Sequence, residues 1–126
     1  MFRYHKLSVY QDARELNKHL GSFIRNTKEI EYYLKSQLGR AGLSVALNIA
    51  EGSGRMTDPD QRRFYVIARS SLTEVNAILD HLEDVYPRAY ETVEPLRPRI
   101  LKLSRMLLGL IRSLEKLNRM NHSAGV

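Results

Sequence analysis

Hydrophobic residues recur at helical spacing along most of the chain, and the first such stripe lies between residues 9 and 27. Its members are three or four positions apart, which places their side chains on one face of an α-helix. Ser8 and Gln11 have the spacing of a capping box, which satisfies free backbone N–H groups at a helix start. We therefore expect a first helix with a buried face formed by Val9, Ala13, Leu16, Leu20, Phe23 and Thr27.

A second stripe predicts a second helix that ends near Glu51. Gly52 and Gly54 follow it with the conformational freedom typical of residues beyond a helix C-terminus. The spacing is again three or four, which indicates one buried face. The members of this stripe are Leu34, Leu38, Ala41, Val45 and Ile49.

A third helix is predicted between Asp58 and Pro87. Asp58 can cap the helix, Pro59 suits its first position, and Gln61 completes a capping box. Pro87 stops the helix, because the residue before a proline disfavours helical geometry. The expected stripe contains Phe64, Ile67, Ala68, Ser71, Val75, Ile78, Leu82 and Val85.

The last quarter of the chain has the most regular pattern, with strictly alternating steps of three and four. This spacing resembles a coiled-coil seam. Pro95 and Pro98 restrict the helix start, because an interior proline lacks a backbone donor. We expect a regular helix over residues 98–119, and the seam consists of Val93, Leu96, Ile100, Leu103, Leu107, Leu110, Leu114 and Leu117.

Four striped helices with short connections predict an all-α, up-down-up-down four-helix bundle. At 126 residues the chain is long enough for one such domain, which we place over residues 1–120, followed by a flexible tail over residues 121–126. No stretch of strand-like alternation competes with this interpretation.

A polar stripe runs beside the apolar stripe of the second helix and continues onto the third. If these helices fold back on each other, Arg40 comes level with Glu74, and Glu51 lies near Arg62 or Arg63. A structural network of hydrogen bonds and ion pairs is the favoured interpretation, and a ligand or partner groove is the alternative. The residues concerned are Gln37, Arg40, Ser44, Asn48, Glu51, Arg62, Arg63 and Glu74.

The fourth predicted helix has two further surface features besides its seam. Leu101, Leu108 and Ile111 form a second apolar line, and such surface usually marks an association site, so we expect a homo-oligomer. A line of cations runs outside both stripes. We call it the basic ridge, and it consists of Lys102, Arg105, Arg112, Lys116 and Arg119.

The net charge of +6 arises entirely in the last quarter of the chain. Residues 1–96 contain 13 basic and 13 acidic residues, whereas residues 97–126 contain seven basic residues and only Glu115 as an acid. This asymmetry favours an anionic partner. One function class is a nucleic-acid-binding accessory protein that contacts phosphates through the ridge; the other is a scaffold that binds a protein partner through the same surface.

The composition argues against an enzyme or a membrane protein. There is no cysteine, and the four histidines (His5, His19, His81 and His122) are scattered without metal-ligand spacing, so we expect no catalytic residues, metal or other cofactor. The longest stretch without a charged residue, Ala41–Ala50, has only ten residues against the roughly 20 that span a bilayer. We expect a cytoplasmic protein.

Several motifs resemble a known family. Ser36-Gln-Leu-Gly-Arg-Ala41, Ser44 and Asn48-Ile-Ala-Glu-Gly52 with Arg55 are similar to the hallmark of the bacterial four-helix-bundle proteins encoded in intervening sequences of 23S rRNA genes. Neighbouring segments agree, including Leu7–Ala13, Arg63-Phe64 and Ser104–Leu114.

The resemblance implies a four-helix protomer, commonly assembled as a ring of five, without established catalytic activity. Members related to the accessory proteins of diversity-generating retroelements are similar to nucleic-acid-binding partners of a reverse transcriptase. The expected partners are therefore other copies of the chain, DNA or RNA, and a reverse transcriptase or another protein.

Overall fold

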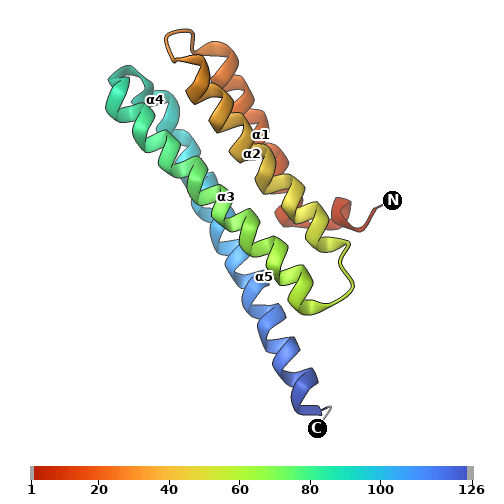
Figure 1. Cartoon of the computed structure of the whole chain (residues 1–126). Coiled ribbons are helices and arrows are strands. Elements are labelled where there is room, and N and C mark those ends of the chain that lie inside the picture. Colours follow the sequence, from red (N-terminus) through yellow and green to blue (C-terminus); the bar gives the residue numbers. More distant parts are fainter. Residues whose placement is uncertain (1, 125–126) are drawn as a thin grey trace.

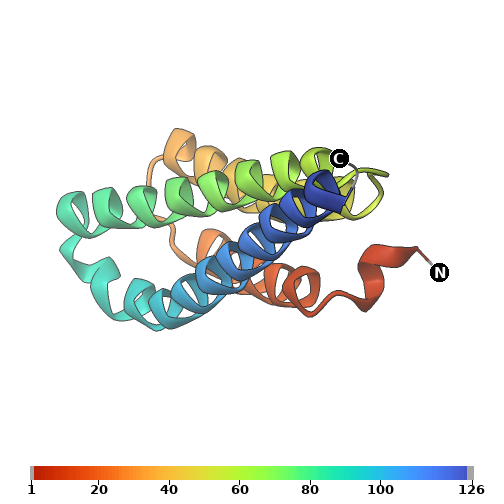
Figure 2. The same cartoon turned by 90° about the horizontal axis from the view of Figure 1, so that it is seen from below.

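A computed structural model describes residues 2–124 and confirms the up-down-up-down bundle (Figure 1). The four main helices are α1 (Ser8–Asn26), α2 (Tyr32–Ser53), α3 (Asp58–Val85) and α5 (Arg97–Ala124). A one-turn helix, α4 (Tyr90–Val93), lies in the α3–α5 connection between two 3₁₀ turns, Pro87–Ala89 and Glu94–Leu96. A third 3₁₀ turn, η1 (Arg3–Lys6), precedes α1. Both chain ends lie at the same end of the bundle (Figures 1 and 2).

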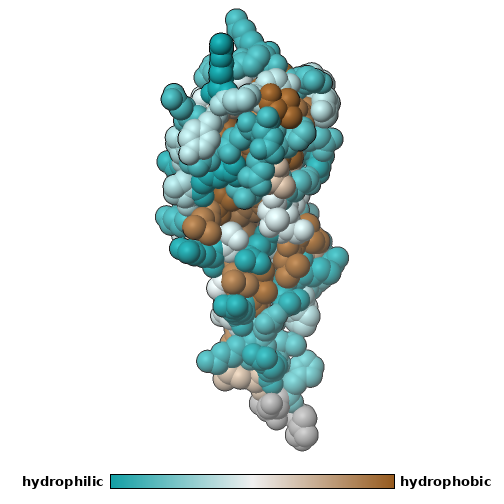
Figure 3. Space-filling model, turned by 90° about the vertical axis from the view of Figure 1, so that its left-hand side faces the viewer, coloured by the Kyte–Doolittle hydropathy of each residue, from teal (hydrophilic) through white to brown (hydrophobic). Residues whose placement is uncertain are grey.

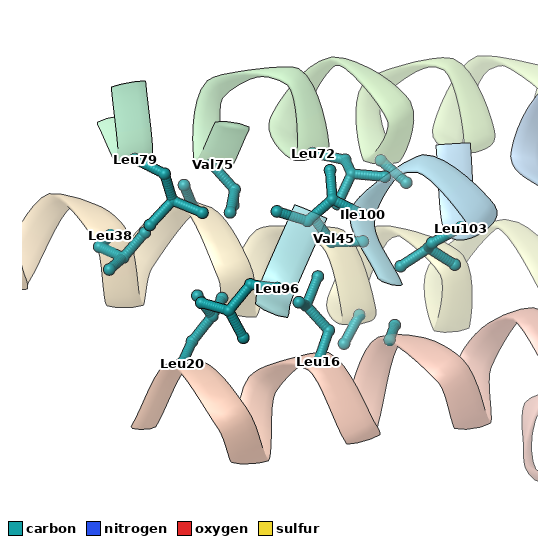
Figure 4. Close-up of a cluster of buried hydrophobic side chains, with 14 of the residues drawn as sticks. Leu16, Leu20, Leu38, Val45, Leu72, Val75, Leu79, Leu96, Ile100 and Leu103 are labelled. Atoms are coloured by element: carbon teal, nitrogen blue, oxygen red, sulfur yellow. The ribbon is translucent and has the colours of Figure 1, made fainter. Parts of the chain in front are cut away.

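The hydrophobic core runs along the bundle axis and draws side chains from all four main helices (Figure 4). Every predicted core position of α2 is buried, and of the α1 stripe only Thr27 is partly exposed. Leu16 and Leu20 of α1 face Leu96 and Ile100, and residues of α2 and α3 close the cluster from the other side (Figure 4). The periodicity of the first two helices therefore identifies their buried faces correctly.

The predicted core face of α3 is partly wrong. Ile67 and Val85 of the expected stripe are 40% and 49% exposed. The buried line instead steps by three and four through Tyr65, Ala68, Leu72, Val75, Leu79 and Leu82. The reason is that α3 packs against both α2 and α5, so apolar residues occupy more than one of its faces and the sequence alone does not single out the central one.

Both predicted capping boxes differ from the structure. Ser8 is already the first residue of α1, and the Gln11 side chain donates a hydrogen bond to the carbonyl of His5 at 2.9 Å instead of bonding the helix start. Thr57, not Asp58, caps α3, because its hydroxyl oxygen accepts a hydrogen bond from the backbone N–H of Asp60 at 3.3 Å. The chain enters each helix one residue away from the predicted cap.

The sequence places both Gly52 and Gly54 beyond the end of α2, but only Gly54 lies there, as the residue after Ser53. Gly52 lies inside α2, and a Cβ atom there would come within 2.8 Å of Cε1 of Tyr65 on α3. No glycine within residues 2–124 has a positive φ angle. Gly52 is therefore a point of close helix approach, and the conformational freedom that the sequence suggested is not used.

The α5 helix begins one residue before the predicted start and continues past the predicted end at Arg119 to Ala124. Pro95 lies in a 3₁₀ turn and Pro98 in the first turn of α5, where a missing backbone donor breaks no helical hydrogen bond. The flexible tail over residues 121–126 stays a prediction, and residues 125–126 lie outside the described residues.

Along α5 one line of the predicted seam gradually leaves the core, whereas the line through Ile100, Leu107 and Leu114 stays buried. Leu103 is 1% exposed, Leu110 is partly buried and Leu117 is 45% exposed. These three positions are one heptad apart, and a straight α-helix rotates by about 20° per heptad relative to a strict seven-residue repeat. Ile111 rotates inward and joins the core in place of Leu110.

A glycine pair on α2 tests the close packing of α1 against α2. A Cβ at Gly42 would lie 2.5 Å from Oδ1 of Asn17 and 2.9 Å from Cδ1 of Leu20, whereas a Cβ at Gly39 would make only an ordinary 3.7 Å contact. We expect Gly42→Ala to lower the unfolding free energy by about 1–3 kcal/mol through overpacking. Gly39→Ala, the matched control, should raise it by roughly 0.5–1 kcal/mol. Urea denaturation measures both, and equal effects would contradict the close approach.

Candidate nucleic-acid interface

The basic ridge lies on the side of α5 opposite the buried residues of this helix. The core takes Ile100, Leu103, Leu107, Ile111 and Leu114, and all five ridge residues are exposed. Gly109 lies on the same outer side, and nothing lies within 4 Å of the position that its Cβ would occupy. The ridge is therefore uncovered along this helix.

One ridge residue is neutralised and four are not. Nζ of Lys102 lies 3.3 Å from Oδ2 of Asp12 on α1, so its charge is shared with an acid. Arg105, Arg112, Lys116 and Arg119 form no ion pair with any acidic side chain of the described part of the chain. The sequence predicted five equivalent cations, and the structure leaves four of them unpaired.

A groove between α3 and α5 adjoins the ridge. It encloses about 430 Å³ over an apolar floor that includes Val66 and Leu108, with Arg69 and Arg112 among its lining residues. Nε of Arg69 donates a hydrogen bond to the carbonyl of Ser104 at 3.3 Å, and no carboxylate within residues 2–124 pairs with it. The unpaired positive charge therefore extends from α5 onto the edge of α3.

Hydrophobic side chains gather midway along this side of the molecule, and hydrophilic ones dominate the narrow end (Figure 3). Of the predicted association residues, Leu101 is 52% exposed and Leu108 is partly exposed. Ile111 is only 6% exposed because it has turned into the core of its own protomer. The prediction that Ile111 contributes to an oligomer interface is therefore wrong, whereas Leu101 and Leu108 remain accessible.

The polar stripe of α2 forms two hydrogen-bonded groups with α3. Arg40 forms an ion pair with Glu74 and donates to the side-chain oxygen of Gln37 at 2.9 Å. One turn further on, the hydroxyls of Ser44 and Ser71 lie 2.8 Å apart. The Asn48 side chain donates to the carbonyl and the hydroxyl of Ser44, so these contacts tie α2 to α3 in the register expected from the sequence.

The predicted pairing of Glu51 with Arg62 or Arg63 is wrong. Glu51 accepts from Arg55 at 3.1 Å, one helical turn away, because the α2–α3 connection brings Arg55 to this side. Arg62 points toward α5, where its Nε donates to Oε1 of Glu115 at 2.7 Å. Arg63 pairs within its own helix with Asp60 at 3.1 Å.

The least exposed charge cluster was not predicted from the sequence. Arg97, at the start of α5, is only 21% exposed in its side chain and lies 2.9 Å from Asp80, 3.1 Å from Glu83 and 3.1 Å from Glu94. It also donates to the Asn76 side chain at 2.7 Å. Only the Glu94–Arg97 pair could have been predicted from the sequence, because these residues are three positions apart. Asp80 and Glu83 belong to α3, and their approach to Arg97 depends on the fold.

The carboxyl groups of Glu83 and Glu94 both lie beside Arg97 and affect each other's protonation. The neighbouring Glu94 carboxyl, followed by burial, raises the pKa of Glu83 above its ordinary value of 4.5. The Glu83 carboxyl, followed by the hydrogen bond from Arg97, lowers the pKa of Glu94. One carboxyl therefore keeps its proton to higher pH while the other stays ionised to lower pH.

Comparison with known proteins identifies the family. The sequence profile described as 23S rRNA-intervening sequence protein matches residues 5–109. The chain belongs to this family. No curated protein matches the chain closely enough to add a more specific identification.

The family match has a boundary that matters for the site. It covers α1 to α4 and the first half of α5, but it ends at residue 109, before three of the four unpaired ridge cations. The match to the 23S rRNA-intervening sequence protein family thus spans most of the bundle, and the C-terminal charge has to be interpreted from this chain itself.

No helix in the described range is long and apolar enough to cross a membrane. Within residues 2–124, no group of three or more histidine or acidic side chains is placed to hold a metal ion.

Removing Arg97 is expected to cost more stability than removing Arg40. Arg97→Met leaves Glu83 and Glu94 without their cation in a largely covered position, and we expect a loss of about 3 kcal/mol. Arg40→Met breaks a pair whose side chains are 56% and 39% exposed, so its loss should stay below about 1 kcal/mol. Urea unfolding of both variants measures this, and similar losses would contradict the assigned importance of the Arg97 cluster.

The raised pKa of Glu83 predicts that the effect of Glu83→Gln on stability depends on pH. A raised native pKa stabilises the fold below the unfolded pKa, and this contribution is lost as the pH rises through the native pKa. Wild-type protein should therefore lose stability relative to Glu83→Gln, which stays neutral, as the pH rises above 4.5. Unfolding free energies at a series of pH values test this, and parallel curves for the two proteins would show that the pKa of Glu83 is not raised in the native state.

Proposed function

We propose that the protein is a non-enzymatic nucleic-acid-binding accessory protein that acts as a homo-oligomer and contacts phosphates through the basic ridge. The observation that carries this proposal is the set of four exposed ridge cations without a carboxylate partner in the described chain. Unpaired arginine and lysine side chains on a convex helix face bind backbone phosphates without reading base edges.

The contrast with the other charged residues supports this assignment. Arg40, Arg55, Arg62, Arg63 and Arg97 each form an ion pair with an acidic side chain. These arginines already have a carboxylate partner within the protomer, so they bind an external anion more weakly than an unpaired arginine does. The ridge differs in that four unpaired cations lie together on one face of one helix, where they can release counterions from the same stretch of nucleic acid.

Assembly of several copies would repeat the ridge around a symmetry axis. Closed rings are a common outcome of head-to-tail contacts, and the apolar residues Leu101 and Leu108 offer a surface to cover. A pentamer is the number that the family resemblance implies. Repetition would give an extended positive surface suited to a long polyanion rather than to a small ligand.

A scaffold that binds a protein partner is the second candidate. It is favoured by a second groove between α3 and α5, distinct from the one beside the ridge. This groove also encloses about 430 Å³ and is lined by Leu72, Ile100 and the exposed Leu101. A partner with an apolar segment could cover this groove, with the basic ridge serving solubility. A reverse transcriptase is one partner that the family resemblance implies.

A salt titration tests the nucleic-acid proposal. Binding to DNA duplex, single-stranded DNA and RNA should weaken with salt, and log K for duplex should fall by about 0.9 per phosphate neutralised. Replacing Arg105, Arg112 and Arg119 together with Gln should lower both the affinity and the slope. The matched control replaces Arg25, Arg88 and Arg99, which are also exposed but lie in the last turn of α1, in the Pro87–Ala89 turn and in the first turn of α5.

Two results would contradict the proposal. Absence of binding to every nucleic acid at low salt would favour the protein scaffold. Equal losses in the two triple variants would show that binding depends on total charge rather than on the ridge.

Assembly is tested by light scattering and two matched charge insertions. Wild-type protein should have a mass several times the 14.6 kDa of one chain at micromolar concentration. Leu101→Glu should reduce this mass, because it places a charge in an apolar contact. Leu43→Glu on α2, where Leu43 is 55% exposed against 52% for Leu101, should not. The opposite pattern would move the interface to α2, and a wild-type mass of one chain would reject assembly.

A further inference from the structure

A hollow lies between the N-terminal turn η1 and the C-terminal part of α2, away from the α3–α5 grooves. It encloses about 650 Å³ and is lined by Phe2, Arg3 and Tyr4 on one side and by Leu47 and Arg55 among others on the opposite side. This volume falls in the range of sites that hold a small organic group such as a nucleotide base with its sugar.

The wall formed by η1 is a stack of aromatic rings with one free end. The rings of Tyr4 and His5 are stacked at 4.4 Å, and Tyr10 of α1 packs edge-on against Tyr4 at 4.7 Å. Phe2 lies next in this series, nearly parallel to Tyr4 with ring centroids 5.7 Å apart. Its side chain is 71% exposed, so another flat ring could continue the stack on it.

The exposed ring is not explained by the packing of this protomer. Leu47, across the hollow, is also 55% exposed, so two large apolar side chains face water at the same place. Burying such side chains is favourable, at about 25 cal/mol per Å² of apolar surface removed from water. A ligand with a flat apolar face would cover both.

The charges around the hollow favour an anionic ligand. Arg3 lines it and Lys6 lies in the same turn, and neither is paired with an acid in the described chain. Glu51 is the one carboxylate among the lining residues, and Arg55 neutralises it at 3.1 Å. The site therefore combines an uncovered aromatic face with unpaired positive charge.

We propose that this hollow is a stacking site for one base of single-stranded nucleic acid, with the base on the Phe2 ring and its neighbouring phosphate held by Arg3. The proposal rests on the nucleic-acid binding proposed above and adds a preference for unpaired strands. Stacking on aromatic side chains tolerates every base, because each base has a π face, so no sequence specificity is expected.

Two features of the chain support this choice of ligand over a duplex. A base within a duplex has both faces covered by its neighbours and cannot lie on Phe2, whereas an unpaired base can. The η1 turn that lines the hollow lies at the same end of the bundle as the C-terminal part of α5 (Figures 1 and 2). One strand can therefore contact positive charge both at the hollow and on the ridge. Residues 2–4 precede the family match, so the match does not describe this wall of the site.

The test compares the affinity of full-length variants for a labelled single strand of uridines and for a DNA duplex over a range of salt concentrations. Phe2→Ala should weaken single-strand binding by about 5- to 150-fold, the effect of losing one base–aromatic stack. Duplex affinity and the salt slope should not change, because the ring carries no charge. Phe2→Trp should restore the binding, and Arg3→Gln should lower the single-strand slope by about 0.7.

Tyr32→Ala is the matched control, since this tyrosine is 82% exposed but lies at the start of α2, at the other end of the bundle. It should leave single-strand affinity unchanged. If Phe2→Ala binds the single strand as wild-type protein does, the stacking site is rejected while phosphate binding stands. If wild-type protein binds no nucleic acid, the proposed function itself fails. If Phe2→Ala instead lowers the oligomer mass, a second copy covers the ring, and the stacking site is likewise rejected.

Discussion

The close approach of α2 to both of its neighbours is the constraint on which the rest of the fold depends. Gly42 faces Asn17 and Leu20 of α1, and Gly52 faces Tyr65 of α3, in each case too closely for a Cβ atom to fit without movement. Small residues at these two points let α2 lie deep between α1 and α3. The register set there brings Arg40 level with Glu74 and Ser44 level with Ser71, so those polar contacts follow from the packing.

The unequal lengths of the helices then determine which surface is free. The α1 helix has 19 residues and α5 has 28, and α5 packs more extensively against α3 than against α1. The C-terminal part of α5 projects at the open end of the bundle (Figure 1). Two seam residues, Leu110 and Leu117, turn away from the core in this region, and the ridge cations face solvent there. Charge asymmetry along the sequence thus becomes charge asymmetry in space, which is the physical basis of the proposed function.

The sequence predicts those parts of the structure that depend on local spacing. The buried faces of α1 and α2 and the Arg40–Glu74 pair follow from steps of three and four and from a simple antiparallel fold-back. The central face of α3 does not follow from spacing, because α3 packs against two helices and has apolar residues facing both. Ile111 was misplaced because a strict heptad drifts around a straight helix. The Arg97 cluster depends on a turn that brings Glu94 back beside Asp80 and Glu83, and spacing within one helix cannot reveal it.

We propose that a nucleic acid lies along the open end of the bundle on surfaces of α5 and η1. Photo-crosslinking of the full chain to a single strand that contains photoreactive uridines, followed by peptide mapping, tests this placement. We expect crosslinks within residues 105–119 and at Phe2 or Tyr4, and none in α4. Crosslinks concentrated in α4 and the α1–α2 turn, at the other end of the bundle, would contradict it.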